Sequence, residues 1–476
     1  MSDTSAIGMR APSPPSVTRK RVARGRLGGI PIEKTAGSLL WIELYLLAVF
    51  GFLRDLLGVP STITYLFDAI NLFLFGAILI RGRYDNRGAY YTYLYGLMLT
   101  FLALTVVGGL RVGTSPLQYL WGLRNTFRFY AFFVCCVTLL GVRDVLRMVT
   151  FFKVLFLVNV GLCSLELAMG FSGDYIGGSF GVLQGGNGYL NILIAIATVI
   201  YVLEYLARKA SFLKLVVMLL LCFYLVAIAE LKVYFFELPI IVLLGILSER
   251  MTSRSATLVI VMVVGIVVGL GIMQFFFNGS GLSFFTDGTI FEYMGDAGYT
   301  GTGDLSRLDA LSRITAMFFS NDPLTRLFGF GLGNCSTSSF EVLMSSFYDH
   351  FSWLHYTWFS DAYVYIETGL SGLMCFEAFF LGVFVVSKMK RYRDADLRVM
   401  TTCCSIVALL SVWLSVYNSS LTVESGYLVY LLLAVPFILD KYRRHGGVSH
   451  ERQLGRQPPH GVSSEADPGP RIEYTA

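Results

Sequence analysis

Residues 256–277 read ATLVIVMVVGIVVGLGIMQFFF, an uninterrupted apolar block. An α-helix needs about 20 such residues to cross about 30 Å of hydrocarbon. Eleven further blocks precede or follow it: 38–53, 62–80, 89–110, 117–140, 147–170, 188–206, 212–229, 234–248, 364–387, 399–416 and 425–440. Charged residues make up 14% of the 476 residues, whereas soluble domains carry about a quarter. The sequence therefore predicts an all-α polytopic membrane protein with about twelve transmembrane helices.

Lysine and arginine concentrate in every second connection between these blocks. The basic connections hold Arg81, Arg83 and Arg87; Arg143 and Arg147; Arg208, Lys209 and Lys214; Arg250 and Arg254; and Lys388, Lys390, Arg391, Arg393 and Arg398. Because cytoplasmic loops carry the excess of basic residues, both termini are expected in the cytoplasm. The same pattern accounts for the net charge of +5 without a nucleic-acid partner.

Five regions follow from this topology. Residues 1–36 contain few large apolar residues and no signal-peptide cleavage site, so we expect a disordered cytoplasmic tail. The remaining regions are transmembrane helices 1–9 (37–277), one large outer loop (278–358), transmembrane helices 10–12 (359–440) and a second disordered cytoplasmic tail (441–476).

The cysteines exclude some chemistries. Seven of the eight fall inside apolar blocks, where cysteine behaves as a small hydrophobic residue, and only Cys335 lies in the outer loop. There is no CxxC pair and no His, Cys and carboxylate cluster at metal-binding spacing. We expect chemistry that uses neither a metal nor a cofactor.

Two arginines lie inside the fourth block, in LWGLRNTFRFY. Arg124 and Arg128 are four residues apart and therefore share one helix face. Charges inside a membrane face a cavity or a partner, and the guanidinium fork suits phosphate oxygens. One hypothesis is that the pair binds a phosphate-like anion. The other is that a carboxylate on another helix, such as Glu43 or Glu166, neutralises it.

A second candidate lies between the seventh and eighth blocks, in AIAELKVYFFE. Lys232 is one of few cations on the outer side and follows Glu230 closely, which suggests a site residue. The alternative is a lysine whose amine simply reaches the membrane interface. The glycine-rich outer segment 173–191, GDYIGGSFGVLQGGNGYLN, is either a flexible connector or a re-entrant loop that lines a cavity.

The outer loop leads into residues 327–373, which begin with the glycine-rich turn LFGFGLGN. The segment holds His350 and His355, the only histidines outside the C-terminal tail, and Asp361 before the next apolar block. A histidine beside a carboxylate can accept a proton from a sugar hydroxyl, although a loop histidine is often merely solvated. Before it, Leu305, Leu308, Leu311 and Ile314 predict an amphipathic helix on the membrane surface.

Three segments resemble the bacterial superfamily of Wzy-type O-antigen or exopolysaccharide polymerases and O-antigen ligases. They are GGSFGVLQGGNGYLNILIAIA, RLFGFGLGN and DAYVYIETGLSGL, and their order matches that of the family. The resemblance implies a GT-C-type membrane glycosyltransferase in the bacterial inner membrane. Such an enzyme transfers a glycan from undecaprenyl pyrophosphate to an acceptor hydroxyl on the periplasmic side, sometimes with a chain-length regulator as partner.

The resemblance also implies roles for particular residues. Arg124, Arg128 and Lys232 correspond to the family's pyrophosphate-binding basic residues, and His355 or Asp361 to the base. Trp358 and Phe359 stand where ligases commonly carry a histidine, which favours a repeat-unit polymerase over a ligase. The choice between His355 and Asp361 stays open.

A lipid-linked oligosaccharide flippase or transporter is the main alternative from another class. Many such carriers also have twelve spans, but the two halves of this chain show no internal repeat. The connection between the sixth and seventh blocks is also short, whereas many twelve-span carriers have a long cytoplasmic loop there. A purely structural membrane scaffold would leave the intramembrane arginines without a role.

Overall fold

The computed structural model describes residues 26–27, 30–80, 89–249, 251–276, 303–338, 340–390 and 392–444. The predicted C-terminal tail lies almost entirely outside the described residues, as do most of the N-terminal tail and residues 277–302 of the predicted outer loop. A two-residue antiparallel pair, β1 (Arg26–Leu27) and β2 (Ile30–Pro31), precedes the first helix.

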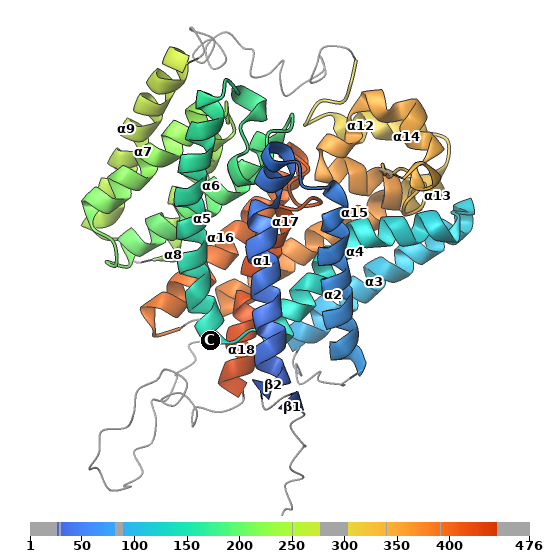
Figure 1. The fold of residues 1–476 in the computed structure, drawn as a ribbon, viewed down its shortest axis with the longest axis horizontal. Helices are drawn as coiled ribbons and strands as arrows, with labels where there is room; N and C mark the ends of the chain where they lie inside the picture. Colours follow the sequence, from blue (N-terminus) through green and yellow to red (C-terminus); the bar gives the residue numbers. More distant parts are fainter. Residues whose placement is uncertain are drawn as a thin grey trace, which may run out of the picture.

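Each of the twelve apolar blocks contains a helix (Figure 1). The first nine are α1 (Ile32–Leu57), α2 (Thr64–Ile80), α3 (Ala89–Val112), α4 (Pro116–Leu139), α5 (Val142–Ala168), α6 (Gly186–Leu206), α7 (Phe212–Ile228), α8 (Tyr234–Ser248) and α9 (Ser253–Phe276). The last three blocks form α15 (Ser360–Met389), α16 (Ala395–Tyr417) and the pair α17 (Gly426–Leu433) and α18 (Val435–Arg444).

Eight helices are long and apolar enough to cross a membrane: α1, α2, α3, α5, α6, α9, α15 and α16. The protein is thus a polytopic helical membrane protein. Among the other blocks, α7 and α8 have only 17 and 15 residues. The last block is divided at Ala434, just before Pro436, which has no backbone N–H to continue α17. The number of twelve spans therefore stays a prediction.

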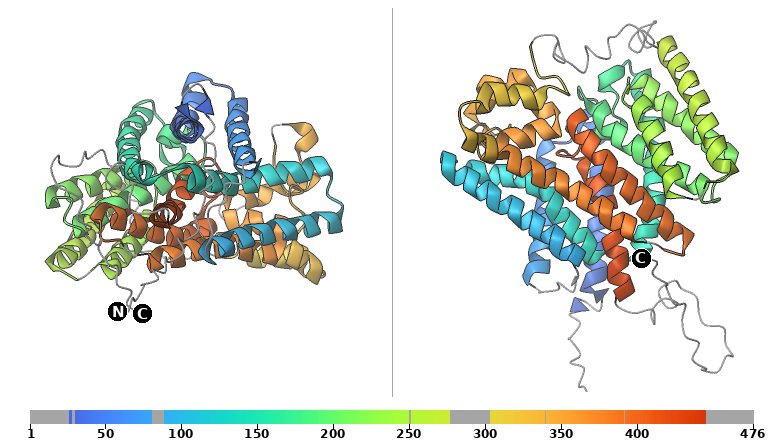
Figure 2. Two further views of the ribbon diagram at one scale, coloured as in Figure 1. Left: turned by 90° about the horizontal axis from the view of Figure 1, so that it is seen from below. Right: turned by 180° about the vertical axis from the view of Figure 1, so that it is seen from behind.

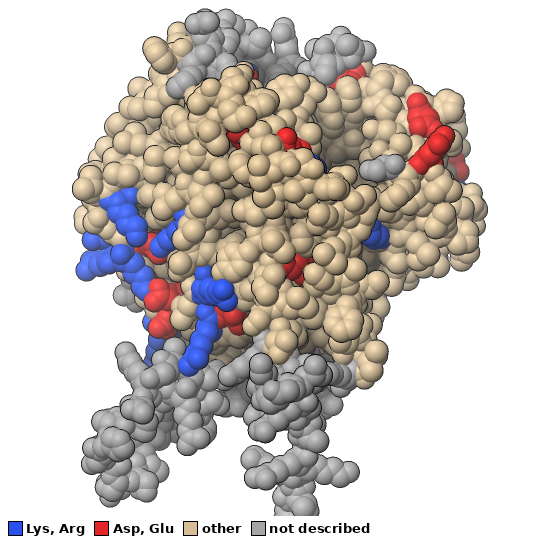
Figure 3. Space-filling model, in the orientation of Figure 1, with Lys and Arg blue, Asp and Glu red and all other residues tan. Residues whose placement is uncertain are grey.

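The two ends of the helical bundle differ. α1 begins and α18 ends at the lower end, whereas the short helices of residues 303–358 lie at the upper end (Figure 1). We call residues 303–358 the outer segment, and the upper ends of the helices their outer ends, after the predicted orientation. Lysine and arginine side chains gather toward the lower end of the face shown in Figure 3, whereas acidic side chains lie in both its lower and its upper part. This is the charge asymmetry on which the predicted orientation rests.

Helix α6 is at the centre of the bundle. Its sequence, GNGYLNILIAIATVIYVLEYL, is apolar on all sides, as expected of a helix surrounded by protein. In the most apolar stretch of α6, 94% of the residues are buried, and α6 contacts α5, α7, α8 and α16. By contrast, only 22% of the residues in the corresponding stretch of α2, and 17% of those in α9, are buried. These two helices are peripheral.

Four short helices form the described part of the outer segment, together with 3₁₀ turns: α12 (Ala310–Ile314), a π-helical turn η4 (Thr315–Phe319), α13 (Pro323–Phe328) and α14 (Ser346–Phe351). The 3₁₀ turns among the described residues are η1 (Ser61–Ile63), η2 (Gly173–Tyr175), η3 (Gly178–Phe180), η5 (Glu341–Leu343), η6 (Ser352–Leu354) and η7 (Tyr356–Trp358). The predicted amphipathic helix is shorter than expected. Leu305 and Ile314 are fully buried in protein, and only Leu308 of the stripe is largely exposed.

Asp322 begins α13 as its N-cap. Its carboxylate accepts hydrogen bonds from the backbone N–H groups of Leu324 (2.9 Å) and Thr325 (3.2 Å). The bonds from Thr325 and from Arg111 at the end of α3 lower the pKa of Asp322 to about 2. A new helix therefore starts at Asn321-Asp322-Pro323.

Helix α15 lies between α3 and α16 (Figure 2) and is broken at Gly369. There φ is 66° and ψ is −169°, a conformation essentially restricted to glycine. The backbone of Leu327–Gly329 crosses at this point, and a Cβ at Gly369 would lie 2.5 Å from the nitrogen of Gly329. The two glycines therefore let the outer segment and α15 touch through their backbones.

Gly369→Ala is expected to destabilise the protein by about 2–4 kcal/mol, because it adds backbone strain and a steric clash. Thermal denaturation of the purified protein in detergent measures the change. Gly271→Ala in α9 is the matched control, since no heavy atom lies within 4 Å of the added Cβ. Equal denaturation temperatures for the two variants would contradict this account of the crossing.

Candidate functional site

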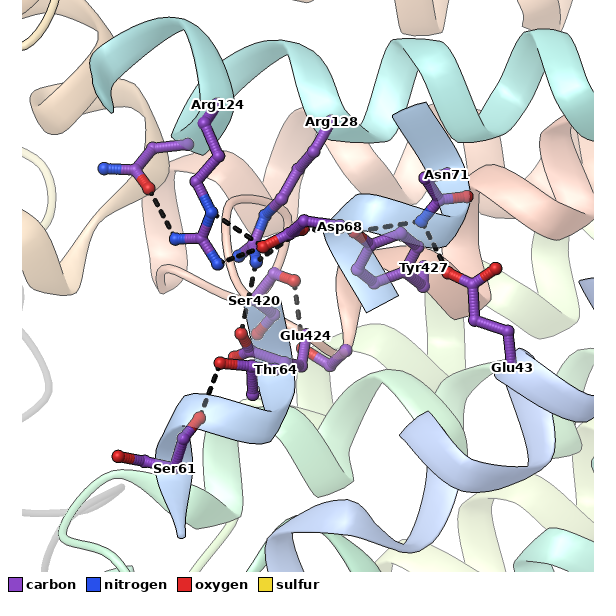
Figure 4. A network of polar contacts seen from close by, with 12 residues as sticks. Glu43, Ser61, Thr64, Asp68, Asn71, Arg124, Arg128, Ser420, Glu424 and Tyr427 are labelled. Carbon is purple, nitrogen blue, oxygen red and sulfur yellow. Dashed lines mark hydrogen bonds and ion pairs between the residues drawn. The ribbon is translucent and has the colours of Figure 1, made fainter. Parts of the chain in front are cut away.

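Arg124 and Arg128 point from α4 toward the outer ends of α2 and α17 (Figure 4). Arg124 contacts Asp68 through Nε, at 2.7 Å from Oδ2, and through Nη2. Arg128 Nη1 lies 3.8 Å from Asp68 Oδ1 and 3.3 Å from Glu424 Oε1. We call these four residues the arginine site. The predicted shared face is confirmed, since both arginines reach the same carboxylate.

The acidic partners differ from those considered from the sequence, Glu43 and Glu166. Asp68 lies in the second turn of α2, and Glu424 lies in the connection between α16 and α17. Burial raises the pKa of Glu424, but the charges of Arg128 and Arg124 outweigh it and leave that pKa below its ordinary value. The Glu424 carboxylate is therefore ionised, and it balances the charge of Arg128.

A chain of polar side chains continues from Asp68 into the bundle (Figure 4). The Tyr427 hydroxyl donates to Asp68 Oδ1 at 3.3 Å. Asn71 Nδ2 lies 3.5 Å from the Tyr427 oxygen and donates to Glu43 Oε1 at 2.5 Å. Glu43 and Asn71 are buried, so this chain holds Asp68 from the interior side.

A third arginine lies close by, at the outer end of α1. Arg54 donates two hydrogen bonds to Asp55, from Nε to Oδ1 at 2.6 Å and from Nη2 to Oδ2 at 3.0 Å. Its charge interacts favourably with that of Glu424. In the upper part of Figure 3, near the outer end of α1, the surface is hollowed and acidic side chains lie at the edge.

The glycine-rich segment 173–191 is largely buried, so it is not a flexible connector. Its backbone N–H groups donate to side chains of neighbouring helices: Gly178 to Glu166 Oε2 (2.8 Å), Ser179 to Asn159 Oδ1 (2.9 Å) and Val182 to Asp55 Oδ2 (2.9 Å). A Cβ at Gly181 would lie 2.1 Å from Asp55 Oδ2. The missing side chain there lets the loop reach α1 beside Arg54.

Lys232 lies in the connection between α7 and α8 and pairs with Glu230 at 2.8 Å. This connection lies against the glycine-rich segment, because Asn187 Nδ2 donates to the carbonyl of Ala229 at 2.9 Å. Lys232 is thus linked to the outer end of α1 through that segment, and its ion pair is with its own neighbour.

The connection between α16 and α17, residues 418–425 (NSSLTVES), joins distant parts of the chain. The Asn418 carbonyl accepts hydrogen bonds from the nitrogen and Oγ of Ser360, at 3.1 and 2.9 Å, where α15 begins. Asn418 Nδ2 donates to the Gly188 carbonyl, at the start of α6, at 3.4 Å. The far end of the connection carries the carboxylate that reaches the arginine site.

His355 has the left-handed backbone conformation (φ 55°, ψ 27°), which is uncommon for residues other than glycine. Its ring stacks on Trp358 with centroids 3.9 Å apart, and Nδ1 lies 3.3 Å from Asp304 Oδ2. The Asp304 side chain is fully buried, whereas that of His355 is 30% exposed. Asp304 was not singled out from the sequence, because 51 residues separate the two.

Asp361 is buried in the first turn of α15 and accepts a hydrogen bond from the backbone N–H of Ala362 at 2.6 Å. The structure therefore pairs His355 with Asp304 and leaves Asp361 bonded within its own helix. Ser360 links this turn to residues 418–425. His350 is exposed, and its Nδ1 lies 2.7 Å from the carbonyl of Ser346.

The glycine-rich turn 329–334 and the two residues after it lie against Glu367 of α15. Glu367 Oε1 accepts hydrogen bonds from the nitrogen of Cys335 (3.2 Å) and from Ser336 Oγ (2.7 Å). On its other side the turn meets α4, where a Cβ at Gly333 would lie 1.9 Å from the Gln118 carbonyl oxygen. The turn thus packs α15 against the outer end of α4, about two helical turns before Arg124.

In the described part of the chain, no group of three or more His, Cys, Asp or Glu residues lies close enough to hold a metal ion. Comparison of the chain with models of protein families and with curated proteins finds no match in either case. Support for a function therefore comes from the fold and the site.

Proposed function

We propose that the protein is a membrane glycosyltransferase that polymerises glycan repeat units carried on undecaprenyl pyrophosphate. The observation that supports this most strongly is Arg128. Its side chain is only 8% exposed, it lies between two carboxylates, and its Nε has no hydrogen-bond partner in the described structure. A buried guanidinium with a free donor is suited to an anionic ligand.

The donor side of the proposal consists of Arg124 and Arg128, with Lys232 as a third cation on the other side of the glycine-rich segment. These groups would stabilise the negative charge that develops on the leaving pyrophosphate. The exposed aliphatic residues around the outer ends of α2 and α4, such as Leu66 (57% exposed) and Leu120 (59%), suit a neighbouring prenyl chain.

The acceptor side consists of His355 and Asp304. In this proposal Asp304 binds Nδ1, and Nε2 accepts the proton from the acceptor hydroxyl. The hydroxyl oxygen forms the new bond to the anomeric carbon, and the bond from that carbon to the pyrophosphate oxygen breaks. The electron pair stays on the pyrophosphate, so no external oxidant, reductant or metal is required.

The direct test uses purified full-length protein in detergent with undecaprenyl-pyrophosphate-linked repeat units as the substrate. We expect a ladder of longer glycans and release of the carrier. A flippase would give no ladder under these conditions. A ligase would transfer glycan only after a lipid A core acceptor was added. If the folded protein forms no ladder, the polymerase function is excluded.

Asp361→Asn separates the two candidate bases. We expect this variant to keep the reaction rate within about tenfold, because a general base contributes about 10²–10⁴-fold and the proposal assigns that role to His355. Initial rates of glycan elongation measure the effect, with Asp349→Asn in α14 as a control for loss of an outer carboxylate. A loss of several hundredfold in Asp361→Asn would make Asp361 the base.

A further inference from the structure

The two carboxylates of the arginine site hold the arginines in different ways. Asp68 contacts Arg124 through two nitrogens and also accepts from Tyr427 at 3.3 Å. Its side chain is 14% exposed and belongs to the helix α2. Asp68 is therefore a fixed partner that positions both arginines.

Glu424 is held more weakly. It makes one contact to Arg128, at 3.3 Å, and its side chain is 36% exposed. It lies in a connection between helices, where a rotamer change moves the carboxylate outward without shifting a helix. The Glu424 carboxylate is the only partner of the arginine site, among the described residues, that combines partial exposure with a place outside a helix.

The formal charges of the arginine site cancel, because Arg124 and Arg128 face Asp68 and Glu424. A pyrophosphate that occupies the site while both carboxylates remain would meet no net positive charge. If Glu424 leaves, the site gains one positive charge, and the Nη1 of Arg128 that Glu424 had contacted can bind the ligand instead. Ligand and Glu424 therefore compete for Arg128.

We infer that Glu424 is an exchangeable counter-ion, which the donor pyrophosphate displaces from Arg128 and which returns to expel the pyrophosphate carrier after transfer. This inference rests on the proposed function, since it assigns a product-release role within the same site. It separates two properties of the site: Arg128 provides binding, and Glu424 limits how long the product stays bound.

The first test measures binding of inorganic pyrophosphate to the purified full-length protein by isothermal titration calorimetry. Glu424→Gln removes the competing charge and keeps the shape of the side chain. We expect about tenfold tighter binding, since a charge-assisted hydrogen bond contributes at least the 1.4 kcal/mol that corresponds to this factor. Unchanged or weaker binding would overturn the inference.

The second test separates chemistry from release. In Glu424→Gln we expect the single-turnover rate of glycan transfer to stay within about twofold, while steady-state turnover falls about tenfold because the product leaves slowly. A structural defect would instead lower both rates. Equal losses in both rates would overturn the inference.

Two further variants keep these tests decisive. Glu424→Asp retains the charge but shortens the side chain, so it should bind pyrophosphate with an affinity between those of wild type and Glu424→Gln. Glu341→Gln makes the same chemical change at an exposed position of the outer segment and should leave binding unchanged.

If Arg128→Gln does not weaken pyrophosphate binding, the proposed function fails. If it does, and Glu424→Gln behaves as wild type, only the present inference fails.

Discussion

Replacing Arg128 with glutamine is expected to slow glycan transfer by about 10²–10³-fold, the loss that follows removal of one donor to a developing anion. The effect is large because Arg128 is nearly enclosed, so its charge is poorly screened by water. Rates of elongation of purified lipid-linked repeats, measured under single-turnover conditions, report the loss directly.

Two comparisons decide whether this loss comes from the phosphate contact. Arg128→Lys keeps the charge without the planar fork, so we expect an intermediate rate. Arg326→Gln removes an exposed arginine of the outer segment and should retain full activity. Because Arg128→Gln leaves Asp68 and Glu424 without this partner, its denaturation temperature must be measured alongside. A folded Arg128→Gln variant with wild-type rates would refute the donor assignment.

Replacing His355 with glutamine is expected to reduce the rate by about 10²–10⁴-fold, the usual contribution of a general base. Glutamine fills similar space but cannot take the proton from the acceptor hydroxyl. Single-turnover rates of glycan elongation measure the loss.

His350→Gln is the matched control, since His350 is the other histidine of the outer segment and is exposed. It should keep the wild-type rate. Asp304→Asn should reproduce part of the His355→Gln loss, because the amide no longer stabilises the imidazolium. A folded His355→Gln variant with the wild-type rate would show that another group accepts the proton.

Much of the helical framework could be predicted from local sequence. Hydropathy alone predicted the helix in every apolar block. The four-residue spacing of Arg124 and Arg128 predicted their shared face. Both properties depend on residues close together in the chain. The break of α15 at Gly369 could not be foreseen, because it depends on the backbone around Gly329, which crosses α15 there and lies 40 residues earlier in the chain.

The partners of the site were missed for the same reason. Asp68 is 56 residues from Arg124, and Glu424 is 296 residues from Arg128. No spacing rule connects residues that are brought together only by helix packing. A usable signal did exist: Asp68 stands inside the apolar run YLFDAINLFLF, and an acid at that depth requires a partner.

The peripheral position of α2 ties the arginine site to the bilayer itself. Whereas α6 is enclosed by protein, only 22% of the residues in the most apolar stretch of α2 are buried, and α2 carries Asp68. A peripheral helix accommodates hydrophobic mismatch by tilting, at a cost of fractions of a kcal/mol per Å. Tilting α2 moves Asp68 relative to Arg124 on α4. The acyl-chain length of the lipids should therefore change the rate of glycan transfer. The rate should be highest in bilayers whose thickness keeps the ion pair between Asp68 and Arg124 aligned.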